Sequence, residues 1–451
     1  MHESIEHQAP RLLVDEYGNF HQIADELARG GQGVVFRTKD TDLAIKQPLD
    51  ASGRPDTNAN LRERFQNIRL LPIPARVPVS LPLAILRDEP GYVMRLLSDM
   101  KSFGMFDLNG KAKKELEDRN AMLPQWLTGI PDEEMALRLL HYANTGSTRR
   151  RLFALAKCAA ILARLHGVGL VYGDISTNNA FVSEGSARDV WLIDADNMRL
   201  ELPCGGTSVY TPGYGAPEVM QGRDQSRPRT DCWAFAVMAF KLLALCHPFV
   251  GKKVLQAEDD GGGWDAEPVA SVENGAPASI EEQAYAGHLP FVDDEDDDSN
   301  EGVGGLPRAL VTTPGLRRLF QETFGAGREH PHCRPAMAFW ALELTKAADH
   351  ALDCPECAMS YFADGHGSCP YCGGERPAFI RVQTPRWEIV IPANTTEFAL
   401  PHRLFYPFSF EYHDDMEYES VLNFAAKTAV PARGANAFPE SLTFKFVEGG
   451  K

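Results

Sequence analysis

The segment from Tyr172 to Asp196 restricts the possible folds of this chain more than any other feature of the sequence. It reads YGD with Asp174, ISTNN with Asn179, an apolar run VWLI, and then DAD, which begins at Asp194. Transfer of a phosphoryl group needs a carboxylate near the acceptor hydroxyl, metal ligands that bridge the phosphates, and a cation beside them. Asp174 suits the hydroxyl role, and Asn179 and Asp194 suit Mg²⁺. The segment therefore predicts a fold that brings these three side chains together.

A glycine-rich turn and a lysine upstream can supply the rest of such a site. The run ARGGQG, with Gly30 and Gly33, lies between two strand-like runs, and its missing side chains would let backbone N–H groups approach phosphate oxygens. The turn lacks the GKS or GKT ending of a P-loop, and a glycine turn in a hairpin is often only a turn. The run LAIK ends at Lys46, where an ammonium could neutralise phosphates once a carboxylate orients it. We expect Glu63, on a helix over residues 58–71, to be that carboxylate.

The pattern of apolar residues changes from strand to helix near residue 100. VVFRT, LAIKQ, SLPLAIL and GYVMRLL have β-branched or apolar residues bounded by Gly, Pro and Asp, which is typical of strands. From Arg149 to Leu165 the apolar residues recur at helical spacing and Gly167 follows, so we expect a buried helix that ends at this glycine. LRRLFQETF and PAMAFWALELTKAADHAL are further helical runs. These patterns predict an α+β fold.

The motifs, in this order, resemble the protein kinase superfamily over about residues 10 to 350, in its bacterial eukaryote-like (Hanks-type) Ser/Thr branch. The resemblance implies a two-lobed protein-kinase-like fold, with an N-lobe over residues 10–97 and a C-lobe over residues 98–350. It implies ATP and Mg²⁺ (or Mn²⁺) as ligands. The residues that it places around the nucleotide are Gly30 and Gly33 in the phosphate-covering loop, Val35, Ala44 and Phe181 around adenine, Met94 and Leu96 at the gatekeeper and hinge, and Lys46, Glu63, Asp174, Asn179 and Asp194 at the phosphates.

Three further motifs match parts of the family that support its active site. Glu218, in the APE motif that closes the activation segment, is expected to pair with Arg334 in the helical lobe. Asp231 resembles the helix aspartate that braces the catalytic loop. Thr211 matches the threonine that supports the catalytic aspartate in Ser/Thr kinases. The resemblance therefore favours serine or threonine hydroxyls as acceptors, on another protein or on the chain itself.

The chain departs from the family pattern in several motifs: Ala28 replaces the first glycine of the phosphate loop, YGD replaces HRD, and DAD replaces DFG. Gly173 replaces an arginine, so the catalytic loop lacks the cation that binds a phosphorylated activation loop. Ser176 stands in place of a lysine, which removes one phosphate-neutralising charge. Asp196 replaces the glycine of DFG, and we expect a solvated or capping side chain rather than an extra Mg²⁺ ligand.

No reacting group is lost at these positions, so an active Ser/Thr kinase is the preferred interpretation. The alternative is a pseudokinase scaffold that acts through the C-terminal region. Nucleotidyl transfer, with ATP bound in reverse, is a third reading.

Cys354, Cys357, Cys369 and Cys372 form two CxxC pairs separated by eleven residues. Two such turns can place four thiolates tetrahedrally around Zn²⁺, with backbone amides donating to the sulfurs; a rubredoxin-like iron site is the alternative. The total of nine cysteines is odd, and the doubled motif suits metal ligation in a reducing compartment better than disulfides. We therefore expect a structural zinc ribbon over residues 351–376 that docks a partner or links domains.

Two remaining segments carry weaker patterns. Between about residues 250 and 310 the chain is rich in Gly and acidic residues, including the run from Asp293 to Asp298, and we expect a solvated insertion because long like-charge runs seldom fold. Over residues 377–451, FIRVQ, WEIVIP, EFALP and SLTFKFVEG read as strands of a small β-rich domain. The order of kinase, ribbon and β domain resembles bacterial stress-response or signalling kinases that work beside a PP2C-type phosphatase and a von Willebrand A-like protein.

The charge balance and the ends of the chain exclude some classes of partner. The formal charge of −17 argues against nucleic acid and anionic lipid, because those partners need a basic surface. The sequence has no run of about 18 apolar residues and no basic start followed by an apolar stretch. We therefore expect a cytoplasmic protein that binds neither nucleic acid nor a membrane.

Overall fold

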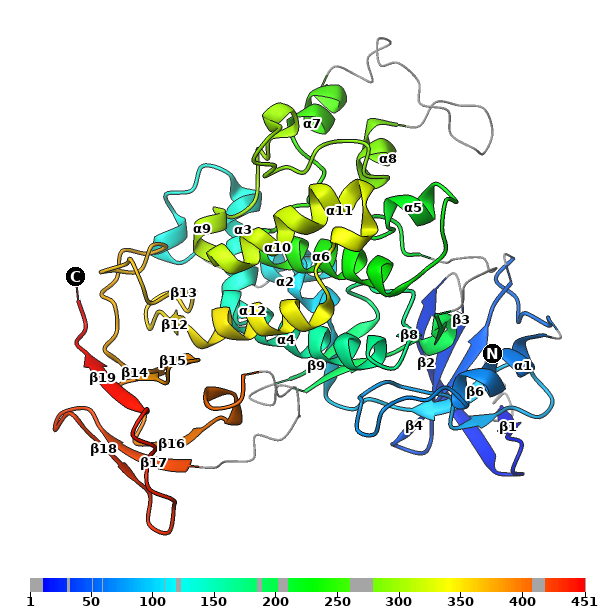
Figure 1. Ribbon diagram of the computed structural model, residues 1–451. Helices are drawn as coiled ribbons and strands as arrows, with labels where there is room; N and C mark the ends of the chain where they lie inside the picture. Colours follow the sequence, from blue (N-terminus) through cyan, green and yellow to red (C-terminus); the bar gives the residue numbers. More distant parts are fainter. Residues whose placement is uncertain are drawn as a thin grey trace, which may run out of the picture.

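The computed structural model describes most of the chain (Figure 1). Residues 31 and 32 of the glycine-rich turn and residues 260–278 of the acidic segment lie outside the described residues. The described stretches are residues 11–30, 33–50, 52–58, 60–108, 110–118, 123–184, 189–201, 210–259, 279–407 and 418–450.

An antiparallel sheet of six strands forms the N-terminal part of the fold, drawn in blue in Figure 1. Helix α1 (Asn60–Arg69) packs Phe65 edge-on against Tyr92 of this sheet, with the ring centroids 4.8 Å apart. The register sets Lys46 opposite Val35, so the lysine lies on an inner strand of the sheet. In spatial order the strands are β1 (Leu12–Val14), β2 (Phe20–Gly30), β3 (Gly33–Thr38), β4 (Leu43–Pro48), β6 (Tyr92–Arg95) and β5 (Ala84–Ile85).

Helices α4 (Ser147–His166) and α6 (Pro228–Ala244) form the centre of the molecule. Helix α4 ends as the sequence predicts, with Gly167 as its C-cap residue. Helix α6 is apolar around nearly its whole circumference, which is typical of a helix buried inside a protein. The other α-helices are α2 (Gly110–Asp118), α3 (Glu133–Asn144), α5 (Pro217–Met220), α7 (Lys252–Asp259), α8 (Ile280–Tyr285), α9 (Arg308–Val311), α10 (Pro314–Phe324), α11 (Ala326–Glu329) and α12 (Met337–Asp349).

Short strands hold the loops between the sheet and the helices. Strand β9 (Ala180–Ser183) pairs with β7 (Met100–Ser102) and β10 (Val190–Leu192), and β8 (Leu170–Val171) pairs with β11 (Arg199–Leu200). The 3₁₀ turn η3 (Ala195–Asn197) follows β10. The loop between β8 and β9 and the turn η3 are therefore the segments that carry the DxxxxN and DAD motifs.

The acidic segment is packed at its flanks, which differs from the solvated insertion that its composition predicts. Asn300 is fully buried and donates to the carbonyl oxygens of Phe249 (3.0 Å) and Pro290 (2.8 Å). Arg308 donates to Asp293 at 2.7 Å. Residues 295–298 are exposed, as expected for a run of like charges. The charged run is solvated, and the apolar and amide side chains around it anchor it to α6 and α10.

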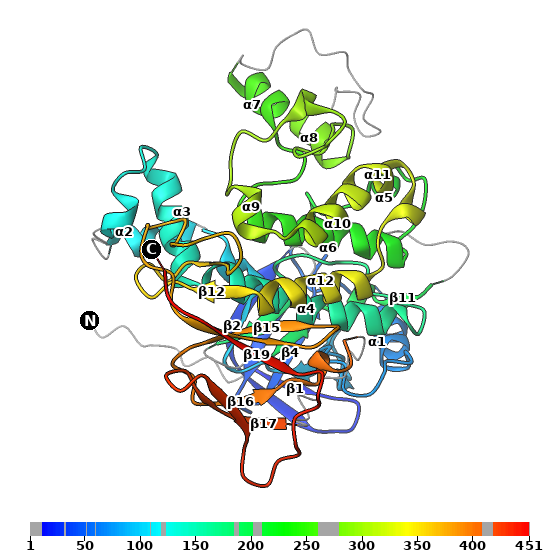
Figure 2. The ribbon, with the colours of Figure 1, turned by 60° about the vertical axis from the view of Figure 1, so that its left-hand side comes forward.

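The C-terminal region contains a small two-stranded pair and two three-stranded sheets (Figure 2). In both views the two sheets lie on the opposite side of α12 and α4 from α7 and α8. Strands are present at all four runs that the sequence singles out, and β17 and β18 are additional. The strands are β12 (Ala351–Asp353), β13 (Ser360–Phe362), β14 (Phe379–Gln383), β15 (Glu388–Pro392), β16 (Glu397–Leu400), β17 (Tyr418–Asn423), β18 (Thr428–Pro431) and β19 (Thr443–Val447).

The end of helix α12 ties these sheets to the helices. Asp349 is buried and accepts hydrogen bonds from Trp387 Nε1 (2.8 Å) and from two nitrogens of Arg403 (2.7 Å each). Among the helices of the described stretches, none combines the length and the apolar character needed to cross a membrane.

Candidate active site

The loop that carries Asp174 is held at its base by Asp231, near the start of α6. The Asp231 carboxylate accepts the N–H groups of Tyr172 (2.8 Å) and Gly173 (2.9 Å), which confirms the bracing role predicted for it. Gly173 has a φ of +83°, and a Cβ added there would lie 3.2 Å from the carbonyl oxygen of Asn197. The glycine that stands in place of the family's arginine is therefore required by this backbone conformation.

Asp174 is buried, and two side chains fix the orientation of its carboxylate. Thr211 Oγ1 donates to Asp174 Oδ1 at 2.8 Å, which confirms the predicted support by Thr211. The Asn179 amide nitrogen donates to Asp174 Oδ2 at 3.1 Å and to the Asp174 carbonyl oxygen at 2.9 Å. Because the amide nitrogen of Asn179 faces Asp174, its carbonyl oxygen is the atom that can ligate a metal ion. Ser176, in the same loop, is buried.

A buried ion cluster joins Lys46 to Asp194 and Asp196. Lys46 Nζ forms an ion pair with Asp194 and lies 2.7 Å from Asp196 Oδ2. The Tyr92 hydroxyl donates to Asp196 Oδ1 at 2.8 Å. The side chains of Lys46 and Asp196 are only 7% and 11% exposed. Asp196 is thus a largely buried partner of Lys46, and the prediction of a solvated side chain at this position is wrong.

Glu63 does not take the place predicted for it. It is exposed on α1, and Lys46 pairs with the two aspartates instead. The next residue, Arg64, reaches the site: it donates to the Asp196 carbonyl oxygen at 2.7 and 2.9 Å and to Asn197 Oδ1 at 2.9 Å. Helix α1 therefore presents a guanidinium group to η3, and the carboxylate that neutralises the lysine comes from η3.

Burial and charge together set the protonation of this cluster. Burial opposes the charged form of Lys46, but Asp196 and Asp194 outweigh it and raise the pKa of Lys46. Burial raises the pKa of Asp194, with Lys46 opposing this shift and Asp196 adding to it. Burial, together with Asp196 and Asp194, raises the pKa of Tyr92 well above its ordinary value. The cluster therefore contains an ammonium group and a neutral phenol that donates to a carboxylate.

The residues predicted to enclose adenine lie on neighbouring strands. Ala44 on β4 is fully buried and pairs in register with Met94 on β6. Val35 on β3 and Phe181 on β9 are half-buried. Val35, Ala44 and Met94 therefore share the six-stranded sheet, and Phe181 lies in the three-stranded sheet of β7, β9 and β10.

Gly33 and Leu96 make contacts within the protein that the sequence does not show. A Cβ on Gly33 would lie 2.8 Å from the carbonyl oxygen of Gln47, so β3 approaches β4 this closely only without a side chain. Gly30 has open space around its Cα. The Leu96 N–H donates to the Asp42 carbonyl oxygen at 2.8 Å. Close strand packing is thus a sufficient reason for Gly33, and the Leu96 amide is already used inside the protein.

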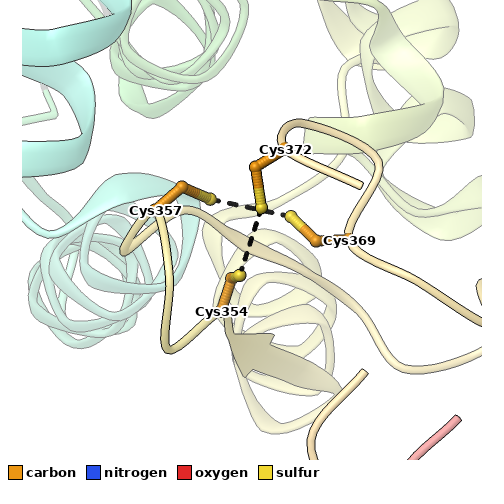
Figure 3. A group of neighbouring side chains, drawn as sticks. All are labelled: Cys354, Cys357, Cys369 and Cys372. Atoms are coloured by element: carbon orange, nitrogen blue, oxygen red, sulfur yellow. Dashed lines mark hydrogen bonds between the residues drawn. The ribbon is translucent and has the colours of Figure 1, made fainter. Parts of the chain in front are cut away.

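The four cysteines converge, with their sulfur atoms turned toward one another (Figure 3). All four Sγ atoms lie within 4.8 Å of one another, and Cys354–Cys372 and Cys357–Cys369 are each 3.6 Å apart. A tetrahedron with zinc–sulfur bonds of about 2.3 Å has sulfurs about 3.8 Å apart. The Gly374 N–H also donates to Cys372 Sγ at 3.4 Å, as expected near a ligating thiolate. The donor set and its spacing fit a four-thiolate metal site.

This cysteine module (residues 351–376) packs into the core of the helical part. Met359 and Tyr361 belong to the same buried apolar cluster as the core residues of α4. The Ser360 N–H donates to Ser147 Oγ at 2.8 Å, and Ser360 Oγ accepts the Arg149 N–H at 2.9 Å. These contacts attach the module to the start of helix α4.

A buried ion pair holds helix α5 against the helical part. The Glu218 carboxylate binds the Arg334 guanidinium through two hydrogen bonds of 2.7 and 2.8 Å, which confirms the predicted pair.

Residues 133–263 match the protein kinase domain family. This matched stretch contains Asp174, Asn179, Asp194 and the other residues of the loop and turn described above.

Similarity to individual curated proteins is limited to a short part of the chain. Ribosomal protein S6 kinase alpha-2 of Mus musculus is 32% identical over 109 residues, which are 22% of this chain and 14% of that protein. Ribosomal protein S6 kinase alpha-6 of Danio rerio is 33% identical over 107 residues, with the same coverage of 22% and 14%. The match thus spans 14% of the length of these relatives.

Proposed function

Because this chain contains a protein kinase domain, we propose that it is an ATP-dependent Ser/Thr protein kinase that transfers the γ-phosphoryl group of MgATP to a protein hydroxyl or to itself. The observation that carries the proposal is the arrangement around Asp174. Its buried carboxylate is held by Thr211 and Asn179, and Asp194 is close enough for the two charges to interact. Phosphoryl transfer depends on such positioning and charge neutralisation more than on covalent chemistry by the protein.

Asp174 is the group that would receive the proton of the acceptor hydroxyl. Both of its carboxylate oxygens already accept a hydrogen bond, so the carboxylate keeps one orientation when the acceptor arrives. General-base catalysis of this kind contributes about 10²–10⁴-fold to a rate. Asp174→Asn should therefore lower the transfer rate at least about a hundredfold.

Asn179 and Asp194 would hold Mg²⁺, since their oxygen atoms are the ligand type that this ion prefers. When bound there, Mg²⁺ would neutralise part of the charge of the phosphates. Lys46 contributes the second positive charge. Its two carboxylate partners keep it protonated inside the site, so it can bind phosphate without taking up a proton.

We assign to Asp196 the role of orienting Lys46, which the sequence gives to Glu63. Asp196 contacts the lysine directly and is itself fixed by the Tyr92 hydroxyl. Asp196 can keep this contact when Asp194 binds a metal ion. Asp196 is thus a positioning residue that acts through Lys46.

The acceptor type and the biological setting have separate grounds. The contact of Thr211 with Asp174 favours serine or threonine hydroxyls. A role in bacterial signalling or stress response, beside a PP2C-type phosphatase and a von Willebrand A-like protein, rests on the order of the domains. Co-purification of the full-length chain with such proteins from its source tests this part of the proposal.

The first experiment is incubation of the purified chain with γ-labelled ATP and Mg²⁺, alone and with a generic Ser/Thr acceptor. Asp174→Asn and Asp194→Asn are the negative controls, and α-labelled ATP runs in parallel. Transfer of the γ label that both substitutions abolish supports the kinase. Incorporation of the α label would instead indicate nucleotidyl transfer.

A scaffold that binds nucleotide without transferring phosphate is the second candidate. The departures from the family pattern at Gly173, Ser176 and Asp196 favour it, because Ser176 leaves one phosphate-neutralising charge missing. Nucleotide binding without transfer of either label, in the presence of candidate partners, would support the scaffold.

We further propose that the cysteine module holds one structural Zn²⁺, with Cys354, Cys357, Cys369 and Cys372 as ligands. Thiolate ligands stay reduced in the cytoplasm, which is the location that we propose. Elemental analysis of the purified protein separates zinc from the rubredoxin-like iron alternative. Cys369→Ser should lower the metal content and the thermal stability together.

A further inference from the structure

A cavity of about 280 Å³ lies between the segment after β7, helix α3 and the C-terminal end of α6. Its polar wall consists of Asp107, Arg138, His141, Lys241 and His247. Two cations thus face a single carboxylate in a chain whose net charge is −17. No residue of this wall belongs to the nucleotide site, so the cavity needs an explanation of its own.

The positive charge of the cavity comes from Arg138 and Lys241, and the histidines add none. Burial lowers the pKa of His247 to about 4 and also lowers the pKa of His141. Each histidine also contacts a backbone carbonyl oxygen through Nε2, at 3.0 and 2.9 Å. Both imidazole rings are therefore uncharged near pH 7.

Lys241 has no carboxylate partner among the residues that the structure describes. Its Nζ donates to the Tyr214 hydroxyl at 3.2 Å and lies 4.5 Å from the centre of the Tyr214 ring. Arg138 pairs with Glu134 at 2.8 Å, but both side chains are exposed (41% and 54%), and such a surface pair is weak and easily exchanged. The Lys241 ammonium and the Arg138 guanidinium can therefore both bind an anionic partner.

The opposing carboxylate cancels only part of this charge. Asp107 forms no ion pair with any described residue; burial raises its pKa, while the charges of Lys241, Arg151 and Arg138 lower it. Behind the wall, the fully buried Arg151 donates only to carbonyl and hydroxyl oxygens, one of them the carbonyl of Phe106 at 3.0 Å. Three cations, Asp107 and the rim carboxylate of Glu134 thus surround this region, which leaves it with one positive charge in excess.

A short chain of contacts joins the cavity to the proposed catalytic loop. The Tyr214 hydroxyl, which binds Lys241, lies 3.3 Å from Thr177 Oγ1. On the same wall His247 contacts the carbonyl oxygen of Gly213 at 3.0 Å. Asp174, Thr211 and Tyr214 also line one pocket, so a polypeptide that presents a hydroxyl to Asp174 comes close to Tyr214. A side chain a few residues from that hydroxyl can then reach the cavity.

We propose that this cavity is a subsite for an anionic side chain of the protein substrate, a few residues from the acceptor hydroxyl, and that Lys241 and Arg138 bind it. The proposal rests on the kinase function proposed above and names the substrate class as acidic. Aspartate, glutamate and a phosphorylated residue share this chemistry. Charged hydrogen bonds of this kind typically change binding by about tenfold or more.

The test uses the full-length protein and serine-centred peptides that differ at a single position. Glutamate, phosphoserine, alanine or lysine is placed in turn at each position on either side of the serine, and kcat/KM is measured for each peptide. We expect one position at which glutamate or phosphoserine raises kcat/KM about tenfold over alanine. The ratio of glutamate to phosphoserine tells a carboxylate site from a phosphate site.

Two variants and one control connect the preference to the cavity. Lys241→Glu should invert the preference at that position from glutamate to lysine, and Arg138→Gln, on the exposed rim, should reduce it. Arg318→Gln, in an exposed pair on α10, is the matched control and should leave the preference intact. Thermal unfolding of each variant checks that it is folded.

Fluorescein-labelled forms of the same peptides, titrated with the protein, separate the two proposals. If no peptide is phosphorylated, the kinase proposal fails, and tighter binding of the acidic peptide that is lost in Lys241→Glu still supports the subsite. Equal binding and equal turnover of the acidic, neutral and basic peptides, or a preference for lysine in the unmodified protein, would overturn the subsite proposal.

Discussion

Replacing Ser360 by alanine should destabilise the whole helical part, because the cysteine module supplies the missing cap of α4. A helix begins with N–H groups that have no intrahelical acceptor. Gly146, the N-cap residue of α4, has no side chain to accept one of them. Ser360 Oγ, on β13, accepts the Arg149 N–H at 2.9 Å instead. Ser360→Ala removes this acceptor and little else, since the Ser360 N–H keeps its bond to Ser147.

The expected loss follows from the burial of this contact. Loss of an N-cap acceptor costs about 1 kcal/mol, and a buried donor without a partner costs about 1–3 kcal/mol. Ser360 is 0% exposed, so water does not replace the hydroxyl. We therefore expect a loss of about 2 kcal/mol, which lowers Tm by roughly 4–8 °C in a cooperative unit of about 150–250 residues.

Thermal and urea unfolding of the zinc-loaded protein measure this loss. Ser52→Ala, at an exposed serine, is the control and should change stability by less than about 0.5 kcal/mol. Repeating the comparison after chelation tests the link to the metal: the effect of Ser360→Ala should shrink once the module no longer holds the serine in place. An unchanged Tm in the zinc-loaded variant, or an equal loss with and without metal, refutes the reasoning.

Three further predictions concern other buried contacts. Glu218→Ala leaves a buried guanidinium unpaired and should cost about 3–5 kcal/mol in urea unfolding. Although burial opposes its charged form, the hydrogen bond with Asp231 raises the pKa of His166 to about 9. The folded state thus binds this proton more tightly than the unfolded state does. The stabilisation that the protonated His166 adds to the free energy of unfolding is therefore complete below about pH 6.5 and is lost as pH rises through 9. The urea midpoint should fall over this range, and it should fall less in His166→Gln. Asp196→Asn should lower kcat/KM for ATP about tenfold, whereas Glu63→Gln should change it little.

Contacts that follow from the order of motifs could be predicted from the sequence. Thr211, Asp231 and Glu218 each lie in a short motif whose neighbours fix the backbone, so their partners could be named from spacing and resemblance. The four-cysteine cluster is predictable for the same reason, because each CxxC turn places two sulfurs on one side of its own backbone. The C-terminal end of helix α4 could be predicted because the helical spacing of its apolar residues ends just before Gly167.

The partner of Lys46 could not be predicted in this way. Asp194 has a φ of +58°, and η3 follows it directly, so the side chain of Asp196 turns back toward the sheet. Pattern alone does not reveal this backbone conformation, and the contact joins residues 150 positions apart. The positively charged cavity is hidden similarly, since Arg138 and Lys241 come from two different helices. The sequence places Lys46 at the end of its strand, but it does not show which carboxylate meets the lysine, because side-chain direction depends on such local turns.

Helix α4 connects the metal module to the catalytic loop, and its length decides what loss of the metal can do. Its N-terminus is capped by Ser360, and its last residue, His166, contacts the Asp231 carboxylate that braces the loop. The helix has 20 residues and is therefore about 30 Å long. Loss of a cap frays mainly the first turn, so it cannot move Asp174 at the far end while the helix stays folded. We therefore infer that metal removal lowers activity only to the extent that it unfolds the helical part, and that activity and unfolding should follow the same curve as a chelator is added.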